Sequence, residues 1–131
     1  MYWLAGLLAS AAAWMLNSLL MRRGGDLVVI GVIPILEETI KTGIAMILGV
    51  SVPLAHSVFG LVEGLHDYVA SKNLGLLAGV ISLISHSFFG QLTVWVFLRS
   101  GSWLYSIAAA GLVHTLFNLS MVRLFKLRAV K

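Results

Sequence analysis

Five ionisable side chains lie in the middle of segments that are otherwise apolar. They are Glu37, Glu38, Glu63, His86 and His114. On a helix, Lys41 lies one turn from Glu37 and Asn118 lies one turn from His114, so each pair shares a face. Two adjacent carboxylates away from water cannot both ionise cheaply, and a nearby lysine can hold one of them charged. These residue types therefore indicate a polar site inside an apolar protein.

The chemistry that this set allows is the hydrolysis of an amide bond. A carboxylate in such a setting is a candidate general base for water. The two histidines and the amide of Asn118 are candidate donors to the oxyanion that forms when water attacks a carbonyl. The chain has no cysteine, which excludes disulfides, thiol catalysis and cysteine metal sites. Ser85 and Ser87 flank His86 but project from other faces of the helix, so a serine nucleophile is not indicated.

The composition is typical of an integral membrane protein. Of the 131 residues, 60% are hydrophobic and 11% are charged, whereas a soluble domain carries about 25% charged residues. The mean hydropathy is +0.99, and no polar stretch is long enough to build a soluble domain. The net charge of +4 is explained by lysines and arginines at cytoplasmic helix ends rather than by nucleic-acid binding.

We predict an all-α fold, a polytopic membrane helix bundle that forms one integral membrane domain over residues 1–131. A bilayer core needs roughly 20 apolar residues per helix, and hydropathy indicates about five transmembrane helices. Their expected bounds are 1–21, 27–50, 54–70, 74–98 and 103–125. The intervening breaks at 22–26, 51–53, 71–73 and 99–102 are short, so consecutive helices should be antiparallel neighbours. We expect the first span to be a retained anchor rather than a cleaved signal peptide, because Arg22 and Arg23 follow it and no positive charge precedes it.

The distribution of positive charge predicts the orientation in the membrane. Of the nine lysines and arginines, seven fall on one side: Arg22, Arg23, Lys72, Arg123, Lys126, Arg128 and Lys131. Only Arg99 falls on the other side, and Lys41 lies inside a span. Positively charged residues favour the cytoplasmic side, so we expect the C-terminus inside and the N-terminus outside.

The depth of the ionisable residues predicts that they meet. The midpoints of the second to fifth spans lie near residues 38, 62, 86 and 114, so four of the five helices place ionisable groups near the bilayer midplane. Each charged group there costs about 2.5–3.5 kcal/mol on insertion scales, which favours convergence on one shared interior site. The pairs Gly60/Gly64 and Gly75/Gly79 would let helix backbones approach closely.

Other polar residues have more than one interpretation. Pro34 either kinks its helix and makes room for water beside the glutamates or is simply tolerated there. We favour Glu38 slightly over Glu37 as the base, because Glu38 lies one turn past Pro34. His56 is interpreted as a helix–helix hydrogen bond. His66 and Asp67 approach the cytoplasmic end of their span, where they either line the site or are solvated.

Four motifs follow one another on successive predicted helices. They are Glu37-Glu38-x-x-Lys41, Phe59-x-x-x-Glu63, His86-x-x-Phe89-Gly90 and His114-x-x-x-Asn118. This ordered set resembles the PrsW-like intramembrane proteases, which are related to the CAAX prenyl endopeptidases (the CPBP group). The resemblance covers residues 30–120. It implies a glutamate-dependent intramembrane endopeptidase in which Glu37 or Glu38 activates water.

The resemblance also implies roles for the other residues and a class of substrate. His114 and Asn118 would stabilise the oxyanion, and His86 would be a second polar contributor. The residues expected to line the site or contact the substrate are Lys41, Phe59, Glu63 and His66. The expected partners are the lipid bilayer and a membrane-embedded or membrane-anchored protein, such as the anti-sigma factors associated with PrsW-type members, in the plasma membrane of a prokaryote. The chain is compatible with an oligomer.

Two departures argue against a prenylated substrate. The CAAX endopeptidases have histidine at the position of Glu63 and usually arginine at that of Lys41. No cofactor and no metal are expected, with a Glu/His/His zinc site as the alternative. Two other classes of function stay open. Midplane carboxylates and histidines also form proton relays in ion-coupled transport proteins, and a non-catalytic scaffold could use the polar core only to fix helix packing.

Overall fold

The computed structural model describes residues 1–70 and 74–129. Within them the chain is helical and contains no strand, which confirms the predicted all-α class. The elements are α1 (Tyr2–Leu27), the π-helical turn η1 (Val28–Val32), α2 (Ile33–Ile47), α3 (Val52–Ala70), α4 (Gly75–Ser100) and α5 (Trp103–Ala129). The predicted break at 71–73 lies outside the described residues, as do Lys72 and Lys131, which contributed to the expected orientation.

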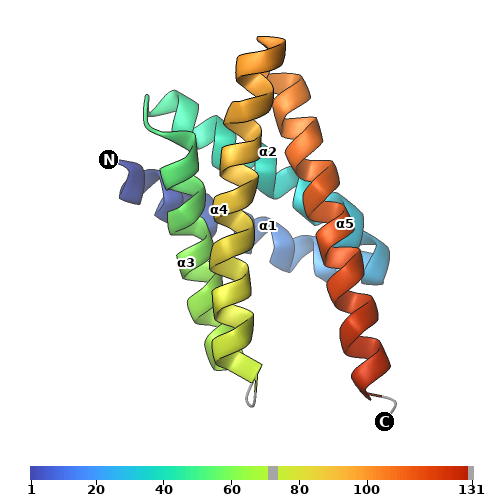
Figure 1. The fold of residues 1–131 in the computed structure, drawn as a ribbon. Coiled ribbons are helices and arrows are strands. Elements are labelled where there is room, and N and C mark those ends of the chain that lie inside the picture. Colours follow the sequence, from blue (N-terminus) through green and yellow to red (C-terminus); the bar gives the residue numbers. More distant parts are fainter. Residues whose placement is uncertain (71–73, 130–131) are drawn as a thin grey trace.

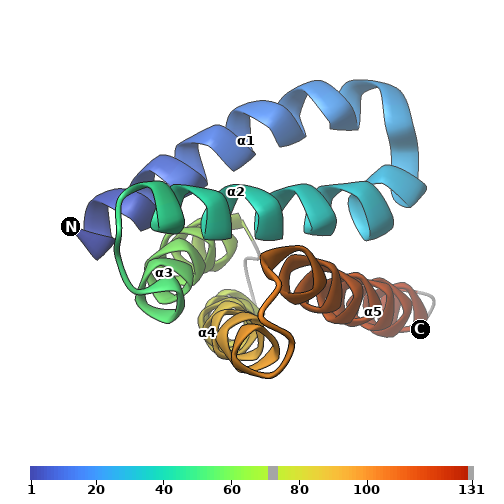
Figure 2. The same ribbon diagram turned by 90° about the horizontal axis from the view of Figure 1, so that it is seen from above.

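The helices form two layers that cross each other. In Figure 1, the axes of α3, α4 and α5 are roughly aligned, and the chain direction reverses from each helix to the next. α4 and α5 meet at the turn between them and diverge toward their other ends. Figure 2 shows that α1 and α2 lie across this layer as an antiparallel pair. α2 packs against α5, and α1 packs directly against α3. The expectation that all consecutive helices are antiparallel neighbours is therefore wrong for α2 and α3, which cross, because hydropathy does not predict helix tilt, which is set by packing.

Three of the described helical segments are long and apolar enough to cross a membrane. They are Tyr2–Arg22, Gly75–Ser100 and Trp103–Leu124. In contrast, α2 has only 15 residues, and α3 has 19 residues that include Glu63, His66 and Asp67. The distribution of side chains is that of a membrane protein: leucines such as Leu76, Leu98 and Leu104 are exposed, while Glu37, Glu38 and Lys41 are buried. The five-span count and the orientation stay predictions.

The connection between α1 and α2 differs from the predicted break at residues 22–26. The α-helix continues to Leu27, and the chain then passes through η1 before α2 begins. Pro34 is the second residue of α2 and is buried. A proline at a helix start lacks only an N–H that would have no partner there. The structure therefore gives Pro34 a third role: it begins the helix that carries both glutamates and does not kink its middle.

Glycines set the distance between α3 and α4. A Cβ atom added at Gly64 would lie 2.6 Å from the carbonyl oxygen of Gly79, and one added at Gly60 would lie 2.8 Å from the Cβ of His86. The two predicted glycine pairs thus do mark a close helix contact, because only glycine leaves room for the facing backbone. This contact brings Glu63 on α3 opposite His86 on α4.

Small residues pack α1 against the rest of the molecule. Ala5, Ala9 and Ala13 recur every fourth residue on one face of α1 and are buried. Ala5 packs in a cluster with Ala45, and Ala9 and Ala13 pack with Phe59. Between Leu7 and Met21, the same helix borders a cavity that reaches the polar cluster.

Candidate active site

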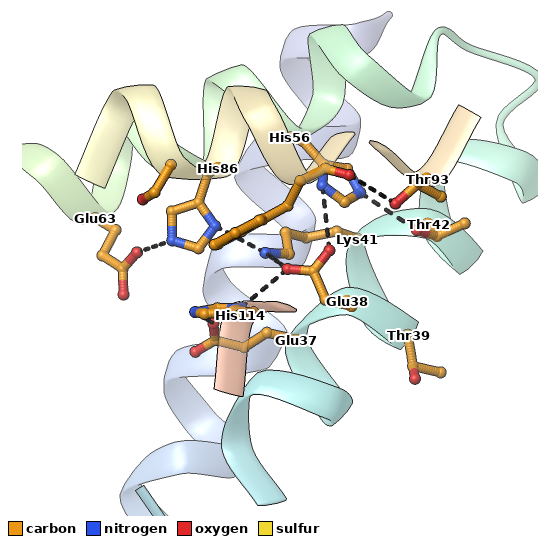
Figure 3. Close-up of polar contacts among 12 residues, drawn as sticks. Glu37, Glu38, Thr39, Lys41, Thr42, His56, Glu63, His86, Thr93 and His114 are labelled. Carbon is orange, nitrogen blue, oxygen red and sulfur yellow. Dashed lines mark hydrogen bonds and ion pairs between the residues drawn. The ribbon is translucent and has the colours of Figure 1, made fainter. Parts of the chain in front are cut away.

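Seven ionisable side chains from four helices converge in the interior (Figure 3). They are Glu37, Glu38 and Lys41 of α2, His56 and Glu63 of α3, His86 of α4 and His114 of α5. Glu63 is 37% exposed, and the other six are buried. The structure therefore brings together the five residues that were predicted to converge: Glu37, Glu38, Glu63, His86 and His114. Three carboxyl groups face one ammonium, so the cluster is not neutral when every carboxyl is ionised and every imidazole is uncharged.

Glu38 contacts three other members of the cluster, although its Oε2 atom forms no hydrogen bond among the described residues. Its Oε1 accepts hydrogen bonds from Lys41 Nζ at 2.5 Å and from His114 Nδ1 at 3.0 Å. Its Oε2 lies 3.5 Å from His56 Nδ1. The Glu38 side chain is fully buried and lines neither of the two cavities beside the cluster.

Lys41 links Glu38 to the next helix. Its Nζ lies 2.9 Å from His86 Nδ1 and 4.4 Å from the centre of the Phe59 ring, a cation–π distance. An ammonium group can only donate, so His86 Nδ1 accepts and the ring proton resides on Nε2. His86 Nε2 then donates to the carboxylate of Glu63, which also accepts from Ser82 Oγ at 3.0 Å. The result is a continuous chain of hydrogen bonds from Glu38 to Glu63.

Glu37 differs from Glu38 in its accessibility. Its Oε1 accepts a hydrogen bond from Asn17 Nδ2 at 2.7 Å, and Glu37 lines the larger cavity. Its Oε2 has no hydrogen-bond donor among the described residues and lies 4.0 Å from His114 Nε2. A separation of this size between two polar atoms is one that a bridging water can span. Glu37 therefore has one oxygen available to a water molecule or a ligand.

The ring of His114 is held on three sides. It stacks on Phe89 with ring centres 4.6 Å apart and meets His86 edge-on at 5.0 Å. Its Nδ1 is bonded to Glu38, so its Nε2 is directed to the space beside Glu37. Asn118, one turn along α5, is half-buried and lines both cavities.

Two cavities adjoin the cluster. The larger, about 830 Å³, lies between α1 and the helices α2, α3 and α5. The smaller, about 220 Å³, lies between α3, α4 and α5. Four residues line both of them: Glu63, Asp67, His114 and Asn118. The cluster is therefore accessible from two directions.

The remaining predicted residues occupy different places. Phe59 is buried against Lys41 and His86. The side chain of His66 is 70% exposed and lies 3.5 Å from Asp67, at the edge of the larger cavity, so it belongs to the rim and not to the centre. His56 does form the predicted helix–helix contact, with Thr42 Oγ1 at 3.3 Å, but its approach to Glu38 also makes it part of the cluster.

Sequence reasoning missed two further contributors. Asn17 of α1 bonds Glu37, and Ser82 of α4 bonds Glu63. Asn17 is the only amide in an otherwise apolar helix, which is the signal that could have identified it. Ser82 lies one turn before His86, and that spacing places the two on one face.

A metal ion is the alternative that the geometry keeps open. Glu37, His86 and His114 each offer a ligand atom, and these atoms lie within 4.8 Å of one another. The set matches the three protein ligands of a catalytic zinc site. However, both ring nitrogens of His86 already take part in contacts, with Lys41 and with Glu63, and coordination would displace one of them.

Comparison of the chain with known protein families, with curated proteins and with solved structures found no match.

Proposed function

We propose that the protein is a glutamate-dependent intramembrane endopeptidase that hydrolyses a peptide bond of a membrane-embedded or membrane-anchored protein. One observation carries the proposal: the Oε2 atom of Glu37 is available to a cavity and lies 4.0 Å from His114 Nε2. A water placed between them would contact both a carboxylate base and a histidine. The order of the motifs, which resembles that of the PrsW-like proteases, points to the same chemistry.

This geometry favours Glu37 over Glu38 as the base, contrary to the slight preference from sequence. Glu38 is bonded to Lys41 and His114 and has no access to either cavity. A general base must reach the proton that it removes, directly or through one water. Glu38 instead suits a supporting role, in which its charge is balanced by Lys41 and its hydrogen bond orients His114.

The proposed reaction needs only water and the peptide. Glu37 takes a proton from water while the water oxygen bonds to the carbonyl carbon, and the carbonyl oxygen becomes an oxyanion. In this proposal His114 must carry a proton on Nε2 in addition to the one that Nδ1 donates to Glu38, and His114 and the amide of Asn118 then donate hydrogen bonds to that oxyanion. Glu37 then delivers its proton to the amide nitrogen as the carbon–nitrogen bond breaks. The products are a carboxylic acid and an amine.

The membrane setting belongs to the same proposal. Three apolar helices can span a bilayer, and the charge distribution favours a cytoplasmic C-terminus, as in the plasma membrane of a prokaryote. A buried site in low dielectric strengthens the hydrogen bonds to a developing oxyanion. A substrate segment that is itself apolar could reach the site from the lipid.

The decisive experiment is cleavage of a transmembrane peptide by pure protein in detergent or liposomes. We expect wild type to cut and Glu37→Gln, which keeps the shape of the side chain, to lose turnover. Thr39→Ala is the matched control, because Thr39 lies on the same helix but points away from the cluster (Figure 3) and is exposed. A folded Glu37→Gln variant that cuts as well as wild type would remove the base assignment. Absence of cleavage by wild type across substrates would favour a scaffold.

A second candidate, proton-coupled transport, is favoured by one specific observation. The hydrogen bonds from Glu38 through Lys41 and His86 to Glu63 join a buried group to a partly exposed one, as in a proton relay. Proton flux into liposomes tests this function. Flux that depends on Lys41 and His86 would support transport, and its absence in liposomes that still cleave peptide would exclude it.

A further inference from the structure

The two cavities that meet at the cluster are lined differently. Seven of the eleven residues around the smaller cavity are polar, and they come from α3, α4 and α5. The larger cavity extends along α1, where Leu7, Ala11 and Trp14 contribute an apolar wall. Hydrolysis within a membrane requires both a supply of water and a place for an apolar peptide, and these two requirements call for different surroundings.

We propose that the smaller cavity is a water chamber that supplies the hydrolytic water, while the larger cavity holds the substrate segment. The assignment of a hydrolytic role rests on the proposed peptidase function. The presence of water in the chamber does not depend on that function and is tested separately below.

The size and the chemistry of the smaller cavity suit water. A water molecule occupies about 30 Å³ of the liquid, so a cavity of about 220 Å³ has room for several waters but not for a peptide segment. Water in a protein interior needs two to four polar partners. Ser85 donates its hydroxyl proton to the carbonyl oxygen of Ser82, which leaves the Ser85 oxygen free to accept from water.

The mouth of the chamber lies at the splayed ends of the helices. Glu63 and Asp67, one turn apart on α3, both line the smaller cavity. Their side chains are 37% and 39% exposed. Near the end of α3, α4 and α5 have diverged from one another (Figure 1). Carboxylates at this opening would attract water and keep lipid chains out.

The inner end of the chamber leads to the base. His114 lines both cavities, whereas Glu37 lines only the larger one. Water that enters past Glu63 therefore reaches His114 first and then the Oε2 atom of Glu37. A peptide in the larger cavity would meet this water from the α1 side. The two cavities thus meet at the four residues that they share, and from there the smaller one extends along α4 and the larger one along α1.

Cysteine labelling tests the presence of water directly. The chain contains no cysteine, so single cysteines can be introduced without background. The test sites are Ser85→Cys and Ala78→Cys, which line only the smaller cavity. The control is Ile84→Cys on α4, which is exposed on the outside of the bundle. Each variant in liposomes is treated with a small charged methanethiosulfonate and, in parallel, with a lipophilic maleimide.

The expected result is faster charged-reagent labelling at one or both test sites than at residue 84. The difference should be about tenfold or more, because a thiol in apolar surroundings forms the reactive thiolate less readily. The lipophilic reagent should label residue 84. If neither test site reacts with the charged reagent faster than residue 84, the chamber is dry and the proposal is wrong.

A second experiment connects the chamber to catalysis. Ser85→Leu fills the chamber and should lower kcat while leaving KM for the peptide unchanged, whereas Ile84→Leu, on the exposed face of the same helix, should retain kcat. An unchanged kcat in a folded Ser85→Leu variant would overturn the hydrolytic role. If wild type does not cleave, the peptidase function fails by itself, and the labelling still decides whether the chamber holds water.

Discussion

The buried ammonium of Lys41 lies 2.9 Å from the Nδ1 atom of His86. Lysine has donors and no acceptor, so this contact determines which ring nitrogen of His86 is free of a proton. The other nitrogen, Nε2, is bonded to Glu63. Lys41 and Glu63 therefore hold the His86 ring from opposite sides. Neither ring nitrogen of His86 is left for a substrate, so His86 serves to position Lys41 and Glu63.

The first prediction concerns the protonation of this ring. His86 should be the Nε2–H tautomer, because Nδ1 accepts from Lys41. Nitrogen NMR of protein labelled at histidine distinguishes the two tautomers, and a His86→Gln variant assigns the signal. In Lys41→Met this preference should weaken, since the donor to Nδ1 is lost. A signal from an Nδ1–H tautomer in the wild type would contradict the assignment.

The second prediction concerns the stability that Lys41 provides. Removing one partner of a buried ion pair leaves the other charge uncompensated, which costs about 3–5 kcal/mol. Lys41→Met should lower the free energy of unfolding in detergent by that amount. The control is Arg99→Met, because Arg99 is exposed and should tolerate the change. Equal stability of the two variants would mean that the Lys41–Glu38 pair is not a structural element.

The third prediction separates the two adjacent glutamates by stability alone. Glu38→Gln removes the charge that faces Lys41 and should destabilise the protein by about 3–5 kcal/mol. Glu37→Gln keeps a carbonyl oxygen that can accept from Asn17, so its cost should be about 1 kcal/mol or less. Chemical unfolding of both variants measures the difference. The reverse order would show that Glu37 and not Glu38 is the structural carboxylate.

The polar centre was predictable because of the cost of burying charge. Ionisable groups in apolar segments must find partners, so similar depths of Glu37, Glu63, His86 and His114 predicted their meeting. The same reasoning undervalued His56, which lies near the end of its helix. Because α2 crosses the other layer, His56 in the first turns of α3 contacts Thr42, which is fully buried.

The crossing of the two helix layers could not be predicted from the sequence. Hydropathy gives the length of an apolar segment but not its tilt, which depends on packing. The connection at residues 22–26 carried glycines and charges typical of a loop, yet α1 continues through it to Leu27. The choice between the two glutamates also depended on this crossing, since α1 supplies Asn17 and the wall of the cavity that Glu37 lines.

The fourth prediction concerns the contact between α3 and α4. A Cβ atom at residue 64 would lie 2.6 Å from the backbone of Gly79, so Gly64→Ala must push the helices apart, at a cost of about 1–3 kcal/mol. Gly43→Ala is the matched control, because nothing lies within 4 Å of its added Cβ and alanine favours helix. In thermal unfolding in detergent, the Tm of Gly64→Ala should be lower than that of wild type, and the Tm of Gly43→Ala should equal or exceed it. Equal behaviour of the two variants would mean that the helices are not in close contact at Gly64.

The fifth prediction concerns metal. The proposed mechanism uses Glu37 and water alone, and both nitrogens of His86 are engaged by Lys41 and Glu63. Peptide cleavage should therefore persist after treatment with a strong chelator, and purified protein should lack stoichiometric zinc. A zinc peptidase treated in the same way serves as the positive control for chelation. If activity is lost with the chelator and returns on addition of zinc, then Glu37, His86 and His114 are metal ligands, and the contacts of His86 must rearrange when the ion binds.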